Sequence, residues 1–180
     1  TALGDLEWIG YSTPFPPFVQ LHLTAGERLI LMVDGINWNA GPFQFWYELT
    51  VSPANDNFAN AAVMTGASAT DTGSILAASG ELGEPLPTAD SAPRTVWWRW
   101  TAPAAGRLTL HAHNWGLGVY QGDALDQLIP IAQDYFQVST HVDAGEEYFL
   151  QLAERPGATP QDYELNLTFT AYLPTDNDDF

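Results

Sequence analysis

The sequence repeats itself at a spacing of about 122 residues, and this repeat limits the folds that are open to it. Three pairs of segments match in the same order: 19–27 with 138–146, 3–9 with 125–131, and 55–58 with 177–180. The register predicts one complete repeat over 51–172. Residues 1–50 match only the second half of that repeat, and 173–180 begin a further repeat or a linker.

Short alternating segments separated by turn residues predict an all-β fold. In the first 50 residues we expect strands at 19–23, 28–34 and 43–49. In the complete repeat we expect strands at 61–65, 95–101, 107–113, 117–120, 128–131, 137–142, 147–152 and 163–169, and a helical turn within 57–62. This spacing predicts a β-sandwich of jelly-roll type, present as a tandem repeat.

The charge of the chain excludes several classes of partner. There are 22 acidic residues against 5 basic ones, a formal net charge of −17. All five basic residues are arginines, too few to build the basic face that a nucleic acid or an anionic membrane requires. No apolar run approaches the ~20 residues of a membrane span, so we expect no membrane insertion. Because the chain has no cysteine, it has no disulfides.

Aromatic side chains supply the candidate binding residues. Along 95–101, Trp98 and Trp100 alternate with Trp97 and Arg99. One pair is expected in the core, and the other would be either a second packed layer or a platform for sugar rings or a neighbouring domain. The full set of candidate binding and interface residues is Trp8, Trp38, Trp97, Trp115, Phe45 and Tyr47.

Several segments resemble the bacterial pre-peptidase C-terminal (PPC) domain family. They are Asn-Asp-Asn-Phe at 55–58, 78–85, the tryptophan-rich 95–103, Val-Tyr-Gln-Gly at 119–122, and 144–148. The resemblance covers 51–172, and 1–50 resembles the second half of the same domain. It implies a β-sandwich found in secreted and cell-surface proteins, often in tandem, as a non-catalytic appendage that in some members binds calcium.

Oxygen-bearing side chains are the candidate calcium ligands, because calcium takes six to eight oxygens. In the complete repeat they are Asp56, Asp71, Glu81 and Glu84, and at the end of the chain Asp176, Asn177, Asp178 and Asp179. The alternative is that these side chains cap turns. His111 and His113 share one strand face, and we interpret them as an exposed pair because no third metal ligand accompanies them.

No catalytic motif is present in the sequence, so we expect a protein that is not an enzyme. The half repeat at 1–50 would expose an apolar face and unpaired edges if it were left alone. It would be covered by another copy of the chain, by further sequence, or by 51–172. The leading hypothesis is an extracellular structural module of a tandem-repeat cell-surface protein or fibre. Its copies would assemble head to tail by strand complementation into a filament. The alternative hypothesis is an accessory substrate- or carbohydrate-binding domain of a secreted hydrolase, with Trp38 or Trp115 holding the ligand.

Overall fold

The computed structural model describes residues 21, 23, 26–34, 41–89, 91, 94–155 and 162–173. The chain divides into two compact units, Thr1–Trp46 and Tyr47–Phe180. The division falls a few residues before the boundary that the repeat predicts after residue 50.

The described part of the first unit contains no strand. The predictions of strands at 28–34 and 43–49 are therefore wrong, and at 19–23 the two described residues, Leu21 and Leu23, are not in a strand. The side chains of Ile30, Leu31 and Met32 are exposed. Alternation marks a segment as able to form a strand, but the strand exists only when a neighbouring segment supplies ladder hydrogen bonds. The described residues of these segments form no strand ladder.

The described part of the second unit contains seven strands. They are β1 (Ala62–Met64), β2 (Ser68–Ser74), β3 (Thr95–Thr101), β4 (Gly106–Gln121), β5 (Ile129–Val142), β6 (Glu147–Ala153) and β7 (Asp162–Ala171). Two short 3-10 turns accompany them, η3 (Phe58–Asn60) and η4 (Leu125–Gln127). The predicted all-β class is confirmed, and η3 lies within the helical turn predicted at 57–62. Because one segment of each matching pair lies wholly or largely outside the described residues, the tandem repeat stays a prediction.

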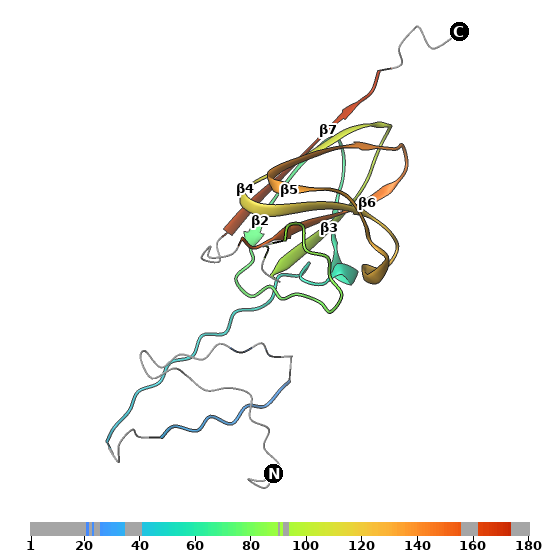
Figure 1. The fold of residues 1–180 in the computed structure, drawn as a ribbon. Helices are drawn as coiled ribbons and strands as arrows, with labels where there is room; N and C mark the ends of the chain where they lie inside the picture. Colours follow the sequence, from blue (N-terminus) through green and yellow to red (C-terminus); the bar gives the residue numbers. More distant parts are fainter. Residues whose placement is uncertain are drawn as a thin grey trace, which may run out of the picture. The chain divides into compact units, whose positions relative to one another are not determined.

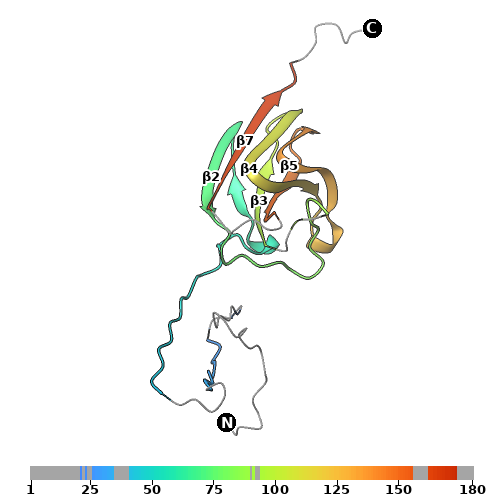
Figure 2. The same ribbon diagram turned by 60° about the vertical axis from the view of Figure 1, so that its left-hand side comes forward.

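The strands form one strongly curved sheet with the order β1-β3-β6-β4-β7-β2, and β5 pairs with β4 beside this path. Strand β4 joins the two halves of the sheet. Its first part, from Gly106 to His111, pairs with β7, and its second part, from Gly116, pairs with β6. Figure 1 and Figure 2 show how β4 and β5 bend together across the fold. The result is a nearly closed, sandwich-like barrel.

Two long strands replace four predicted short ones. The predicted strands at 107–113 and 117–120 are parts of β4, and those at 128–131 and 137–142 are parts of β5. The prediction at 95–101 has the bounds of β3. Strand β2 was not predicted, because its Ser-Ala-Thr-Asp-Thr-Gly-Ser sequence has little β-propensity. It forms because β7 pairs with it over its whole length.

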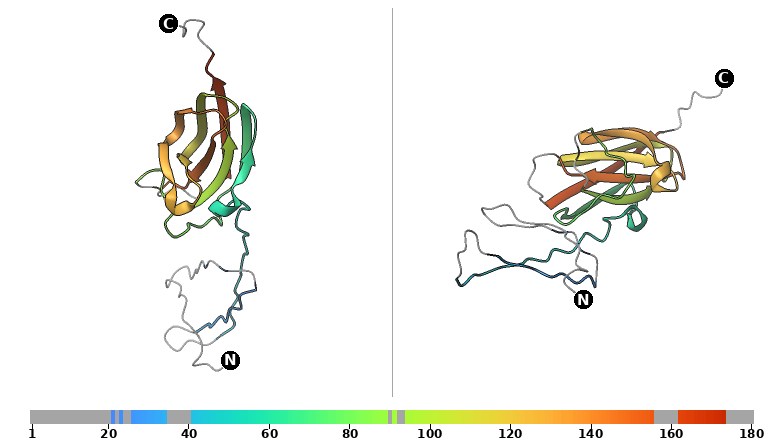
Figure 3. Two further views of the ribbon diagram at one scale, coloured as in Figure 1. Left: turned by 90° about the vertical axis from the view of Figure 1, so that its right-hand side faces the viewer. Right: turned by 60° about the horizontal axis from the view of Figure 1, so that its bottom comes forward.

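The sheet curves around an interior (Figure 3), and the core side chains come from strands on all sides of it. Trp98 and Trp100 of β3 pack there with apolar residues of β4, β6 and β7, among them Leu110, Leu150 and Leu167. The opposite face of β3 is also covered, because the Trp97 ring packs against Phe58 of η3 at 5.4 Å. The first four residues of β3, Thr95–Trp98, are therefore buried on both faces, whereas Arg99 and Thr101 are exposed.

Candidate functional site

The predicted calcium ligand Glu84 accepts hydrogen bonds from the interior of the fold. Its Oε1 accepts from the Trp97 indole Nε1 at 2.8 Å, from Gln151 Nε2 at 3.0 Å, and from the Thr95 hydroxyl. Its Oε2 accepts from the backbone N–H of Glu81 at 2.7 Å. Charge-assisted hydrogen bonds of this kind are stronger than neutral ones. Glu84 thus holds the buried Trp97 indole in place and stabilises the turn from Glu81 to Glu84.

Glu81 and Asp56 bind the first turn of the unit to the loop before β3. The Glu81 Oε2 accepts from the backbone N–H of Phe58 at 2.5 Å. The Asp56 Oδ1 accepts from the Ser79 N–H at 2.6 Å, and its Oδ2 accepts from the Ser79 hydroxyl at 2.9 Å. These contacts place the PPC-like segments 55–58 and 78–85 side by side.

Asp71 acts in the same way on the other side of β3. Its Oδ2 accepts from the Trp98 indole Nε1 at 2.6 Å, and its Oδ1 accepts from the backbone N–H of Thr72 at 3.0 Å. Asp71 also lies near the Tyr163 hydroxyl. Burial, and next the negative charge of Asp71, raise the pKa of Tyr163 to about 12.

The four carboxylates do not gather around one point. Glu84 binds the indole on one face of β3, whereas Asp71 binds an indole from the core face. In the part of the chain that the structure describes, no three His, Asp or Glu side chains are grouped to hold a metal ion. The second group of candidates, residues 176–179, lies outside the described residues. Calcium binding therefore stays a prediction.

The candidate aromatic residues divide into two groups. Trp97 is fully buried, which agrees with the packed layer, one of the two alternatives predicted for it. Trp115 is only 6% exposed, so the expectation that its ring is exposed is wrong. Trp115 belongs to the core cluster, and Phe58 of η3 covers Trp97. Phe45 and Tyr47 are 55% and 82% exposed. Trp8 and Trp38 lie outside the described residues.

The sequence did not indicate a groove that lies between β1 and β2. These strands end the sheet path at its two extremes and do not pair with each other. Two cavities of about 530 and 240 Å³ line this side, and both have Ala62 and Asp71 in their walls. Tyr163 lines the larger cavity, and Trp98 lines the smaller one. The groove is therefore the open side of the barrel and reaches the aromatic core.

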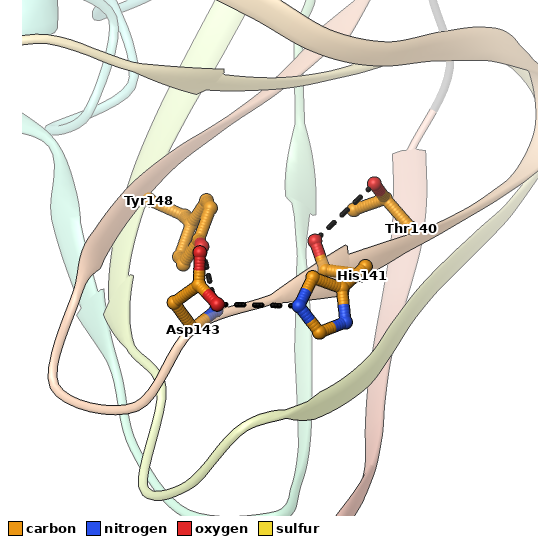
Figure 4. Close-up of polar contacts among 4 residues, drawn as sticks. All are labelled: Thr140, His141, Asp143 and Tyr148. Carbon is orange, nitrogen blue, oxygen red and sulfur yellow. Dashed lines mark hydrogen bonds and ion pairs between the residues drawn. The ribbon is translucent and has the colours of Figure 1, made fainter.

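The histidines of the second unit lie on outward faces. His111 and His113 are exposed on β4 while Leu108 and Leu110 are buried, as the alternation predicted. Figure 4 shows a further exposed histidine, His141, whose Nε2 lies 3.2 Å from Asp143 Oδ1.

Two residues connect this histidine to its surroundings. The backbone N–H of Asp143 donates to the Tyr148 hydroxyl at 2.9 Å (Figure 4). The His141 ring stacks on Tyr172 at 5.3 Å, with 9° between the planes. The sequence did not indicate this ring stacking, because His141 and Tyr172 are far apart along the chain.

Comparison with known proteins adds little to this picture. No family model matches the chain, and no curated protein matches it. Among solved structures there is a similarity to the periplasmic g-type lysozyme inhibitor PliG of Salmonella Typhimurium. It has 12% identity and a TM-score of 0.35, and it covers 61% of this chain and 98% of that one. A TM-score this low does not establish a shared fold, and the inhibitor's activity is not transferred to this chain.

Among the described residues, no helix has the length and apolar character needed to cross a bilayer.

Proposed function

We propose that the chain is a non-catalytic, extracellular β-module of the PPC type that binds a second copy of itself by strand complementation. Two observations, taken together, support the proposal. Residues 43–49, Phe-Gln-Phe-Trp-Tyr-Glu-Leu, are exposed and lie outside any strand, and the barrel of the second unit has an open side between β1 and β2.

The segment 43–49 has the pattern of a donor strand. Phe43, Phe45, Tyr47 and Leu49 alternate with Gln44, Trp46 and Glu48, so an extended conformation would place the first four on one face. Figure 2 shows 41–53 as an extended stretch without helix or strand. A chain in this conformation gains both backbone hydrogen bonds and side-chain burial when it joins a sheet edge.

The edge of β2 can receive such a strand. Its seven residues, Ser68–Ser74, pair with β7, which is the only partner of β2 among the described residues, and the register is unbroken. The other long edge strand, β5, contains Pro130 and a register shift near Phe136, features that oppose strand addition. The groove beside β2 reaches Trp98 and Met64, which offers an apolar surface to the alternating side chains.

The test measures the mass of the full chain by analytical ultracentrifugation over a range of concentrations. We expect the mass to rise with concentration, and to rise further with added salt because each copy carries a net charge of −17. The double substitution Phe45→Ser and Tyr47→Ser should abolish association. The control Trp46→Ser removes a ring from the opposite face of the segment, 82% exposed, and should associate like the parent.

Two outcomes contradict the proposal. One is a parent chain that stays monomeric at every concentration and salt level. The other is a Trp46→Ser variant that loses association as completely as the double variant, because the effect would then follow from general hydrophobicity. A synthetic peptide of residues 41–51 should compete with association, and the same peptide with both serine substitutions should not.

A further inference from the structure

The corner of β4 departs from regular strand geometry. Strand β4 leaves β7 after His111 and joins β6 at Gly116, and its register with β5 shifts over the same interval. Asn114 has a φ of 68°, and Phe136 on β5 has a φ of 65°. Among the described residues these are the non-glycine residues with positive φ. A bulky residue in this region is unusual, and such strain often marks a ligand site.

The strained backbone gathers aromatic rings on the surface. The His113 ring lies 6.0 Å from Phe136, and the Tyr135 ring lies 6.3 Å from Phe136. The Tyr135 hydroxyl accepts a hydrogen bond from the Thr88 hydroxyl at 2.7 Å, which fixes the position of this ring. His113 is exposed, and Phe136 retains 39% of its surface in contact with solvent.

Arg155 completes the cluster. Its Cζ lies 5.5 Å from the Tyr135 ring centre and 5.8 Å from the Phe136 ring centre, so the guanidinium lies against both rings. Arg94 forms an ion pair with Glu154 at 3.3 Å, but Arg155 has no carboxylate partner within the described residues. In a chain with 22 acidic residues, an exposed arginine held by rings and not by an acid leaves its N–H groups available to a ligand.

We propose that this corner, which we define as His113, Asn114, Tyr135, Phe136 and Arg155, binds a sugar unit that carries a carboxylate. The guanidinium fork of Arg155 matches a carboxylate. The exposed aromatic surface covers the apolar C–H face of a sugar ring, and the imidazole and amide of His113 and Asn114 bind its hydroxyl groups. The site is independent of the strand-complementation function.

Two observations favour a sugar with isolated charges over other anionic ligands. Both strands have left-handed backbone here, so the edge does not continue the regular ladder that a peptide strand needs. The net charge of −17 repels polyanions at long range, so the acidic unit should lie among neutral sugars.

The experiment uses isothermal titration of the full chain. The probes are oligosaccharides that end in glucuronate or sialate, the same oligosaccharides ending in a neutral sugar, and short peptides with a free carboxyl terminus. We expect the acidic oligosaccharides to bind, and Arg155→Gln to weaken binding by at least about tenfold, which is typical of losing a charge-assisted contact. Arg99→Gln removes an exposed charge elsewhere on the unit and should leave the affinity unchanged.

A second variant distinguishes a loss of binding caused by the missing Phe136 ring from a loss caused by unfolding. Phe136→Gly removes the ring at a position whose backbone suits glycine, so it should abolish binding without lowering the melting temperature. The proposal is overturned if no acidic oligosaccharide binds, if the neutral ones bind equally well, or if only the peptides bind. It is equally overturned if Arg155→Gln and Arg99→Gln have the same effect.

Discussion

At the scale of single residues, the acidic side chains near β3 act as acceptors for its tryptophans. The indoles of Trp97, Trp98 and Trp100 donate to Glu84, to Asp71 and to the Gly66 carbonyl, respectively. Among the described residues no buried side-chain polar atom lacks a hydrogen-bond partner. Burying an indole without an acceptor destabilises a fold, so these acids allow the first four residues of β3 to be covered on both faces.

Two buried tyrosines predict how stability depends on pH. Burial raises the pKa of Tyr120 to about 12, and burial with the charge of Asp71 does the same for Tyr163. In the unfolded chain a tyrosine titrates near pH 10. The unfolded state therefore loses protons first, and the folded state loses stability as the pH rises from about 10 to 12.

The measurement is urea unfolding at several alkaline pH values. Each tyrosine should lower the free energy of unfolding by about 1.4 kcal/mol per pH unit in this window, and neither should matter below it. Tyr120→Phe should reduce the slope of the unfolding free energy against pH by the contribution of one tyrosine, about 1.4 kcal/mol per pH unit. Tyr172→Phe, at an exposed residue, should leave the slope unchanged. A slope that does not change in Tyr120→Phe contradicts the assignment.

At the scale of elements, the long bent strands β4 and β5 determine the architecture. A single 16-residue strand exchanges partners from β7 to β6 at its corner, and this exchange joins the two halves of the sheet. Gly118 makes room inside the bend, because a Cβ there would lie 2.4 Å from the Tyr120 ring. Glycine and strained residues therefore mark the places where the strand departs from a regular ladder.

The strain at the corner can be tested with two substitutions at Asn114. Asn114→Val places a β-branched residue at positive φ and should lower the free energy of unfolding by about 1–3 kcal/mol. Asn114→Gly should leave it unchanged or raise it by up to about 1 kcal/mol. Chemical denaturation measures both. If both variants are destabilised equally, the side chain of Asn114 and not its backbone conformation is what matters.

At the scale of the whole molecule, a net charge of −17 favours cation binding, and a bound calcium ion would stabilise the folded state. The candidate ligands Asp56, Asp71, Glu81 and Glu84 already accept hydrogen bonds from N–H and O–H groups. A calcium ion would have to bind to oxygen lone pairs that these donors leave available. The calcium prediction, which follows from the acidic pattern and the PPC resemblance, thus competes with a structural role for the same side chains.

Thermal unfolding with calcium and with EDTA decides between these roles. If calcium binds the folded state, an ion concentration a hundredfold above the dissociation constant stabilises it by about 2.7 kcal/mol, and EDTA should lower the melting temperature. Glu84→Gln should remove this difference, and Asp126→Asn, at an exposed acid on η4, should retain it. Equal melting temperatures in calcium and in EDTA contradict the calcium prediction.

The sequence by itself determined the all-β class, most strand positions of 51–172 and the outward face of His111 and His113. These follow from local alternation, which depends only on neighbours along the chain. Only the tertiary structure decided that Trp97 and Trp115 are buried, that β2 forms, and that residues 28–34 and 43–49 are not in strands. The physical reason is that burial and ladder hydrogen bonds depend on which distant segments cover a strand, and residue order alone does not specify those partners.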